Sequence, residues 1–180
     1  MMKTPHDVLT FWRDAGPERW YEKDAAFDAD MERQFLATWE LASKGELSTW
    51  EDTDEGTLAL LIVLDQFSRN LFRGDVRAFQ NDPMAREIAN RAIARGVDQR
   101  IDAALREFIY MPFEHSEDLT DQKRSVALFR ATENGDNLKW AILHLEIIEK
   151  FGRFPHRNKV LGRVSSPEEE AYLADGGFSG

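Results

Sequence analysis

Three short segments of this 180-residue chain hold most of the side chains that could do chemistry. The candidates are Asp65, Arg69 and Arg73 in residues 65–73; Glu114, His115, Glu117 and Gln122 in residues 110–122; and His144, Arg153, His156, Arg157 and Asn158 in residues 144–158. Arginines bind carboxylates and phosphates through paired hydrogen bonds, and imidazoles beside carboxylates transfer protons. We therefore predict a pocket that binds a small anionic molecule or an acidic group.

The pattern assigns two kinds of role. His115 or His144 is the candidate acid or base, and Glu114, Glu117 or Asp65 is expected to orient an imidazole. The other nine candidates are expected to bind the ligand or to orient these groups, with Arg69, Arg73, Arg153 and Arg157 contacting the anion. Neither the reaction nor a cofactor follows from these residue types.

A purely structural interpretation stays open for the same residues. On a helical wheel of residues 137–151, His144 lies on the buried face centred on Ile148, together with Trp140, where a backbone carbonyl or a carboxylate would satisfy it. Asp65 and Arg69 have the i,i+4 spacing of an ion pair that fixes helix packing. In this interpretation the polar groups only satisfy one another.

A bound metal is disfavoured. The chain has no cysteine, so thiolate metal sites and disulfides are excluded. His115, His144 and His156 with a carboxylate have suitable ligand atoms, but the nearby arginines would repel a cation. We predict no metal site.

Helix signals position these segments from end to end. Thr4-Pro5, Asp24, Asp54, Ser116, Asp136 and Ser166-Pro167 are expected to start helices, and glycines 45, 74, 96 and 152 to stop them. The predicted helices cover residues 5–14, 24–43, 54–73, 83–95, 98–111, 116–133, 137–151 and 167–175. The result is an all-α fold of about eight helices packed as antiparallel helical hairpins. We expect one domain, residues 1–175, with a flexible tail, residues 176–180.

Charge and hydropathy limit the partners. The net charge of −10, with arginines interleaved among carboxylates, argues against a nucleic-acid groove. The longest apolar run, "LALLIVL" at 58–64, is too short to span a bilayer. We expect a cytoplasmic protein with no nucleic-acid or membrane partner; its oligomeric state does not follow from the sequence.

A second function is open, a helical module that binds a peptide or protein in a groove. Trp12, Trp20 and Trp50 lie near predicted helix ends and could line such a groove, whereas Trp39 and Trp140 are expected in the core. Exposed tryptophans would favour this interpretation over the anion pocket.

Three motifs carry a family resemblance: "LDQFSRNLFRG", "FIYMPFEHSEDLTDQ" and "FGRFPHRNKVLGR", followed by "SSPEEEAYL". In this order they resemble the bacterial domain of unknown function 924 along essentially the whole chain. The resemblance implies an all-helical fold of the tetratricopeptide-like superfamily, and it implies no activity. The matching positions include all twelve candidates above, together with Gln66 and Asn70.

Overall fold

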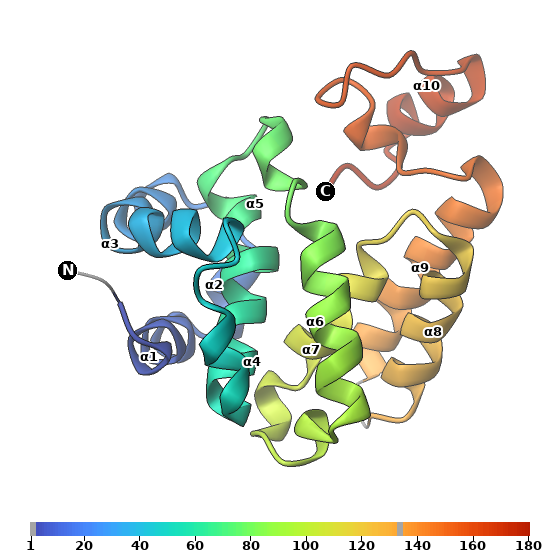
Figure 1. The fold of residues 1–180 in the computed structure, drawn as a ribbon. Helices are drawn as coiled ribbons and strands as arrows, with labels where there is room; N and C mark the ends of the chain where they lie inside the picture. The colour runs from blue at the N-terminus through green and yellow to red at the C-terminus, as the bar shows by residue number, and fades with distance from the viewer. Residues whose placement is uncertain (1–2, 133–134) are drawn as a thin grey trace. The chain divides into compact units, whose positions relative to one another are not determined.

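The structure, a computed structural model, describes residues 3–132 and 135–180. The chain divides into two compact units, Met1–Pro112 and Phe113–Gly180, and each is described by itself below. Every regular element in the described ranges is a helix and none is a strand, as the ribbon shows (Figure 1). The predicted all-α fold is confirmed. That the chain forms one domain stays a prediction.

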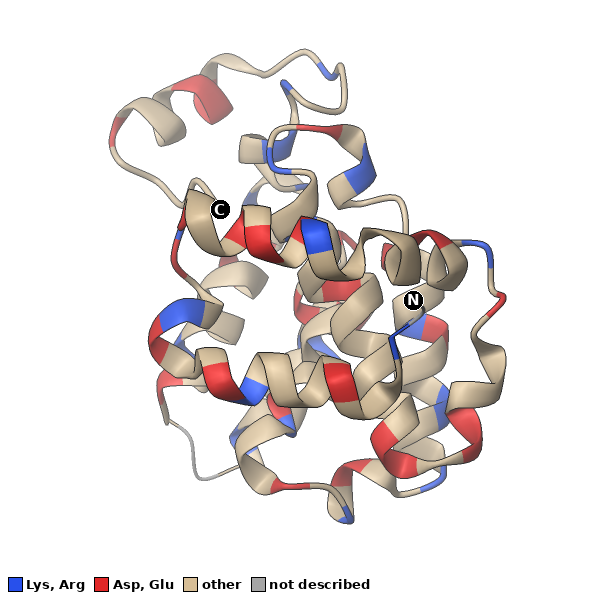
Figure 2. Cartoon of the chain, turned by 90° about the vertical axis from the view of Figure 1, so that its left-hand side faces the viewer, with Lys and Arg blue, Asp and Glu red and all other residues tan. Residues whose placement is uncertain are grey.

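The first unit consists of helices joined by short 3₁₀ turns. Its α-helices are α1 (Pro5–Ala15), α2 (Pro17–Trp20), α3 (Ala25–Ser43), α4 (Asp54–Leu61), α5 (Ser68–Leu71) and α6 (Asp82–Ala94), and the unit boundary falls within α7 (Glu107–Glu114). The 3₁₀ turns are Ser48–Asp52, Val76–Ala78, Val97–Gln99 and Ala103–Leu105. Lys and Arg are interspersed with Asp and Glu along these helices (Figure 2).

Local capping explains where these helices begin. Thr4 and Asp7 form a capping box at the start of α1, in which each side chain bonds to the backbone of the other residue. The Asp24 carboxylate accepts hydrogen bonds from two backbone N–H groups of α3. These interactions span only two or three residues, which is why the sequence predicted both starts correctly.

A widened turn interrupts the central helix of the first unit. Between α4 and α5 the residues Ile62–Phe67 form a π-helical turn, so the helix predicted over 54–73 runs on to Leu71 with one irregularity. Asp65 and Gln66 lie in this turn, and both are buried. π-turns are rare and occur often at functional sites, and nothing in the periodicity of this segment indicated one.

Aromatic side chains fill the core around this helix. The Trp12 ring contacts Phe67 and Phe108, and Trp20 stacks on Trp12 with ring centroids 5.9 Å apart. Trp39 is buried and donates its indole N–H to Ser68 Oγ at 2.7 Å. Trp12 and Trp20 therefore belong to the core, and the prediction that they line a groove was wrong.

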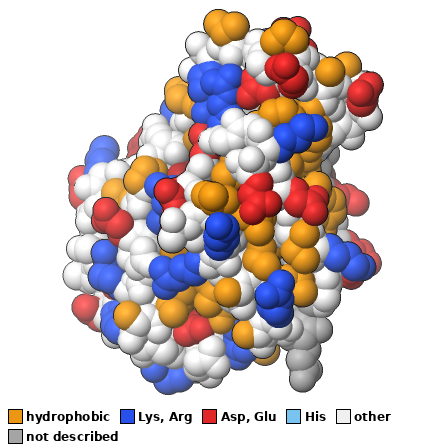
Figure 3. Space-filling model, turned by 90° about the vertical axis from the view of Figure 1, so that its right-hand side faces the viewer, with side chains coloured by type: hydrophobic (Ala, Val, Ile, Leu, Met, Phe, Trp, Pro, Cys, Tyr) orange, Lys and Arg blue, Asp and Glu red, His pale blue; other side chains and the backbone are white. Residues whose placement is uncertain are grey.

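The second unit contains α8 (Leu119–Arg130), α9 (Gly135–Phe151), the 3₁₀ turn Pro155–Arg157 and α10 (Pro167–Ala174). The helices α8 and α9 pack side by side as a hairpin (Figure 1). The face turned to the viewer in Figure 3 shows hydrophobic side chains broken up by acidic and basic ones. Ser166 and Glu169 form a second capping box at the start of α10, as the Ser166-Pro167 signal predicted.

Several predicted boundaries differ from the structure. Residues 98–106 form 3₁₀ turns, and α7 starts only at Glu107 and continues through Pro112. The ring of Pro112 fixes a φ that a helix accepts, at the cost of one hydrogen bond, so proline did not end the helix there.

The predicted caps at Ser116 and Asp136 were also wrong. Asp118 caps α8 through the backbone N–H groups of Thr120 and Asp121, while Ser116 Oγ accepts from the Asp118 N–H in the preceding turn. Asp136 lies inside the first turn of α9. The last residue of the predicted helix 116–133, Glu133, lies outside the described residues.

Candidate functional site

His144 lies at the centre of the polar groups of the second unit. It is on the buried face of α9 with 6% of its surface exposed, as the helical wheel predicted. Its Nδ1 is 2.8 Å from the carbonyl oxygen of Trp140 and 3.4 Å from Oε1 of Glu114. Trp140 itself is about half exposed, so its predicted place in the core was wrong.

Burial keeps this imidazole neutral. Loss of hydration lowers the pKa of His144 to about 3, and electrostatic interactions with His115, Arg157 and His156 act in the same direction. Since a carbonyl oxygen only accepts hydrogen bonds, Nδ1 carries the proton that it donates to Trp140. Nε2 is then the unprotonated nitrogen, and the contact with Glu114 is not an ion pair.

Aromatic rings and a guanidinium surround the imidazole. The ring centroids of Phe154 and Phe178 lie 5.4 and 4.7 Å from the ring centroid of His144. The His115 ring is 6.5 Å away, and the backbone carbonyl of His115 accepts a hydrogen bond from Arg157 at 3.0 Å. The Arg157 guanidinium also stacks on Phe154, at 4.6 Å from the ring centroid. The second unit therefore gathers these predicted groups around one neutral base.

Gln122 fixes the segment that carries Glu114 and His115. Its side chain is fully buried in α8, and its amide nitrogen donates to the carbonyl oxygens of Glu114 and Ser116, each at 2.6 Å. These bonds hold the turn between α7 and α8 against the helix. Gln122 thus positions the backbone of Glu114 and His115. None of these hydrogen bonds is to the imidazole of His144.

Glu169 holds the loop that follows α9. Its carboxylate accepts two hydrogen bonds from Arg153, at 2.7 and 2.8 Å, and one from the Asn158 amide at 3.1 Å. Hydrogen bonding from Arg153 is the main reason why the pKa of Glu169 is lowered to about 2. Glu169 was not predicted as a site residue, although the spacing from Ser166 to Glu169 is that of a capping box.

Glu117 holds the start of the same loop. It accepts the backbone N–H of Phe154 at 2.8 Å and pairs with both terminal nitrogens of Arg163, at 2.8 and 2.9 Å. Although burial alone would raise it, the pKa of Glu117 is lowered by the bonds from Arg163 and the Phe154 N–H. Arg163 also donates to Asn158 Oδ1, and it had no signal of its own in the sequence.

A second cluster lies wholly within the first unit. Arg69 forms paired hydrogen bonds of 3.1 Å with the Asp82 carboxylate and an ion pair of 3.1 Å with Asp65. Although burial alone would lower it, these two carboxylates raise the pKa of Arg69. The predicted Asp65–Arg69 pair is present, whereas Asp82 was not anticipated.

Arg73 also binds a carboxylate of the first unit. Its guanidinium binds the Asp28 carboxylate at 2.6 Å, and Asn70 donates to the other oxygen of Asp28 at 2.7 Å. The first unit therefore brings Asp65, Arg69 and Arg73 together with carboxylates of its own. The prediction that all three segments line one pocket stays a prediction.

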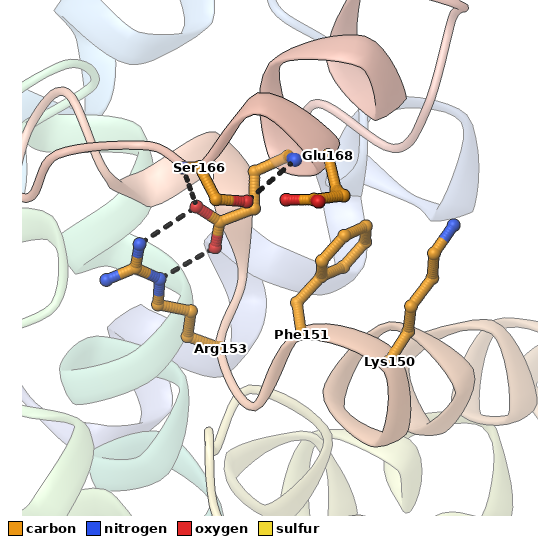
Figure 4. A pocket seen from close by; sticks show the side chains of 6 residues that line it. Lys150, Phe151, Arg153, Ser166 and Glu168 are labelled. Atoms are coloured by element: carbon orange, nitrogen blue, oxygen red, sulfur yellow. Dashed lines mark hydrogen bonds and ion pairs between the residues drawn. The ribbon is translucent and has the colours of Figure 1, made fainter.

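An open depression of about 500 Å³ lies between the end of α9 and the start of α10. It is lined by Lys150, Phe151, Arg153, Ser166, Glu168 and Glu169. Figure 4 shows the Phe151 ring between the side chains of Arg153 and Lys150, with Glu168 on the opposite rim. Arg153 forms an ion pair with Glu169 in this depression. The lining therefore carries charges of both signs and does not select for an anion.

Two further findings concern metals and membranes. Across residues 3–132 and 135–180, no three His, Asp or Glu side chains are grouped so that they could hold a metal ion. Within the same described ranges, no helix has the length and apolar character needed to cross a membrane.

Fold and site together define an all-α protein with a buried, neutral histidine as its candidate base. The chain belongs to the family described as "Bacterial protein of unknown function (DUF924)", whose model matches residues 8–177. It is similar to a solved structure, that of the protein of unknown function ATU0120 from Agrobacterium tumefaciens, with 44% sequence identity and a TM-score of 0.93. The match covers 96% of this chain and 97% of the other. A comparison with curated proteins gave no match.

Proposed function

We propose that the second unit binds a small organic acid beside His144, with the Nε2 atom of this residue as hydrogen-bond acceptor. The observation that carries the proposal is the fixed tautomer of His144. Its Nδ1–H is held by the Trp140 carbonyl at 2.8 Å, so the lone pair is on Nε2. An imidazole with one nitrogen held in this way presents the other nitrogen as a hydrogen-bond acceptor.

The charges around His144 favour an anionic ligand. The guanidinium of Arg157 acts on the imidazole as a positive group. Arg157 lies close to the histidines, since it stacks on Phe154 and bonds to the backbone of His115. A carboxylate that enters this region gains a charge-assisted hydrogen bond from a guanidinium. A hydroxyl group next to the carboxylate would donate a hydrogen bond to Nε2.

Arg69, Arg73 and Arg153 are not assigned to the ligand in this proposal. Arg69, Arg73 and Arg153 are each bound to a carboxylate of their own unit at 3.1 Å or less. Displacing such a partner would leave a carboxylate without its cation, which is costly when the group is buried. These three arginines therefore stay with their carboxylate partners in this proposal.

The test is a thermal-shift screen of small carboxylic acids and inorganic phosphate. The variants are the wild type, His144→Asn and, as a matched control, His6→Asn on the exposed surface of α1. Asparagine keeps an N–H where Nδ1 lies and removes the acceptor at Nε2. An acid present at ten times its Kd raises the unfolding free energy by about 1.4 kcal/mol, a shift of about 3 °C.

The proposal requires this shift in the wild type and in His6→Asn and its loss in a folded His144→Asn. An equal shift in all three proteins would place the ligand elsewhere. If no acid shifts the wild type, His144 is a structural core histidine.

A further inference from the structure

The depression between the end of α9 and the start of α10 carries two charged side chains without an ionic partner. Neither Lys150 nor Glu168 forms an ion pair with any residue that the structure describes. Hydrogen bonding from its own backbone N–H and from the Ser166 side chain lowers the pKa of Glu168, so its carboxylate is ionised at neutral pH. One positive and one negative charge in the lining are thus available to a ligand.

The ring of Phe151 forms an apolar floor between these two charges. It packs on the ring of Tyr172 with centroids 5.1 Å apart, and both rings contact the buried cluster of Ile147, Ile148 and Phe154. In Figure 4 the Phe151 ring separates the side chains of Glu168 and Lys150. Because the floor is anchored in the core of the second unit, it keeps its place when the depression is empty.

The Lys150 ammonium group lies at the edge of this floor. Its Nζ is 4.9 Å from the centroid of the Phe151 ring and 5.7 Å from that of Tyr172. Contacts of a cation with aromatic rings are favourable, and they leave the N–H donors free for an anion.

The other two charges of the lining neutralise each other. Arg153 donates two hydrogen bonds to the Glu169 carboxylate, at 2.7 and 2.8 Å, and the Ser166 N–H donates to the same carboxylate at 2.8 Å. With two basic and two acidic side chains, the lining has no net charge. An ion of either sign therefore meets repulsion as well as attraction, whereas a molecule with both signs can match both free charges.

We propose that this depression binds a small zwitterion with an apolar chain between its two charged ends. Its carboxylate binds Lys150, its ammonium group binds Glu168, and its chain lies on the Phe151 ring. The volume of about 500 Å³ is in the usual range for sites of small molecules. His144 does not line this depression, so the inference is independent of the proposed function.

The experiment titrates three matched probes into nitrogen-15-labelled protein and follows the amide chemical shifts of the lining residues. The probe ε-aminohexanoate carries both charges, hexanoate lacks the ammonium group and hexylamine lacks the carboxylate. Lys150→Met and Glu168→Gln each remove one charge of the site. Lys139→Met and Glu170→Gln are the matched controls, because they change exposed residues of the same two helices outside the lining.

We expect ε-aminohexanoate to bind the wild type about fivefold more tightly than either other probe, the effect of one exposed ion pair. Lys150→Met should weaken the binding of ε-aminohexanoate and hexanoate about fivefold and should not weaken that of hexylamine. Glu168→Gln should weaken the binding of ε-aminohexanoate and hexylamine and should not weaken that of hexanoate. The two control variants should bind all probes as the wild type does.

The zwitterion class is overturned if hexanoate or hexylamine binds the wild type as tightly as ε-aminohexanoate, or if no probe binds. The position of the site is overturned if neither Lys150→Met nor Glu168→Gln changes the affinities. His144→Asn separates this inference from the proposed function. It should keep the binding of ε-aminohexanoate in the depression, and loss of that binding in a folded His144→Asn would place the probe beside His144 instead.

Discussion

The Nδ1 atom of His144 lies 2.8 Å from the carbonyl oxygen of Trp140, one turn earlier in α9. This contact occupies a carbonyl that also belongs to the helix, and it fixes which nitrogen of the imidazole carries the proton. The side chain of Trp140 is meanwhile about half exposed, beside the ring of Phe178. One residue therefore supplies the hydrogen-bond acceptor with its backbone and an aromatic contact to Phe178 with its side chain.

The first prediction concerns the protonation of His144. Because burial lowers its pKa to about 3, we expect a neutral imidazole with the proton on Nδ1 at every pH above about 4. Nitrogen-15 NMR of the imidazole nitrogens measures both the tautomer and the titration, with a histidine-containing peptide as reference. Titration close to the ordinary value of about 6.5 would contradict the prediction.

The second prediction is a dependence of stability on pH. An unfolded histidine gains a proton below about pH 6.5, whereas folded His144 gains one only near pH 3. The contribution of His144 to stability is thus complete above pH 6.5 and is lost as the pH falls towards 3. We expect a loss of about 2 kcal/mol between pH 7.5 and pH 5.

His144→Asn should lack this part of the pH dependence, because asparagine does not titrate. Urea denaturation of the wild type and the variant at several pH values gives the comparison, and the difference between the two curves removes the contributions of the carboxylates. Parallel curves would mean that His144 has the same pKa in both states.

The third prediction concerns the carboxylate that holds the loop after α9. Glu169→Gln removes the charge that binds Arg153, and we expect a loss of about 2 kcal/mol, the usual value for hydrogen bonds to charged groups. Glu168→Gln is the matched control, since this neighbour is exposed. Urea denaturation measures both. A loss as large in the control would show that the acidic first turn of α10, and not the pair with Arg153, provides the stability.

The fourth prediction separates Arg69 from the candidate site. Arg69→Met leaves the buried Asp65 and Asp82 without the guanidinium that both contact, so we expect a loss of about 3 kcal/mol or more. Arg33→Met, which breaks an exposed pair with Asp30, should change stability by about 0.5 kcal/mol or less. A small effect of Arg69→Met on stability, with a large effect on acid binding, would return Arg69 to the ligand site.

Residue types and spacing predicted some residues of the candidate site and missed others. His144 was found because the helical wheel turns it inward, and Asp65 was paired with Arg69 because residues four apart share a helix face. Asp82 and Asp28 were missed, although they bind Arg69 and Arg73, because no local pattern links residues 13 and 45 positions apart. Glu169 and Arg163 were missed for the same reason.

The all-α fold and most helix starts and stops could be predicted from the sequence. Capping boxes, prolines in the first turn and glycines with positive φ act over a few residues, so they can be recognised without knowing what packs around them. Only the tertiary structure decided which tryptophans are buried, which carboxylate each arginine binds and what lies against His144. These outcomes depend on side chains that packing brings together from distant parts of the chain, and helical periodicity fixes the direction of a side chain but not its partner.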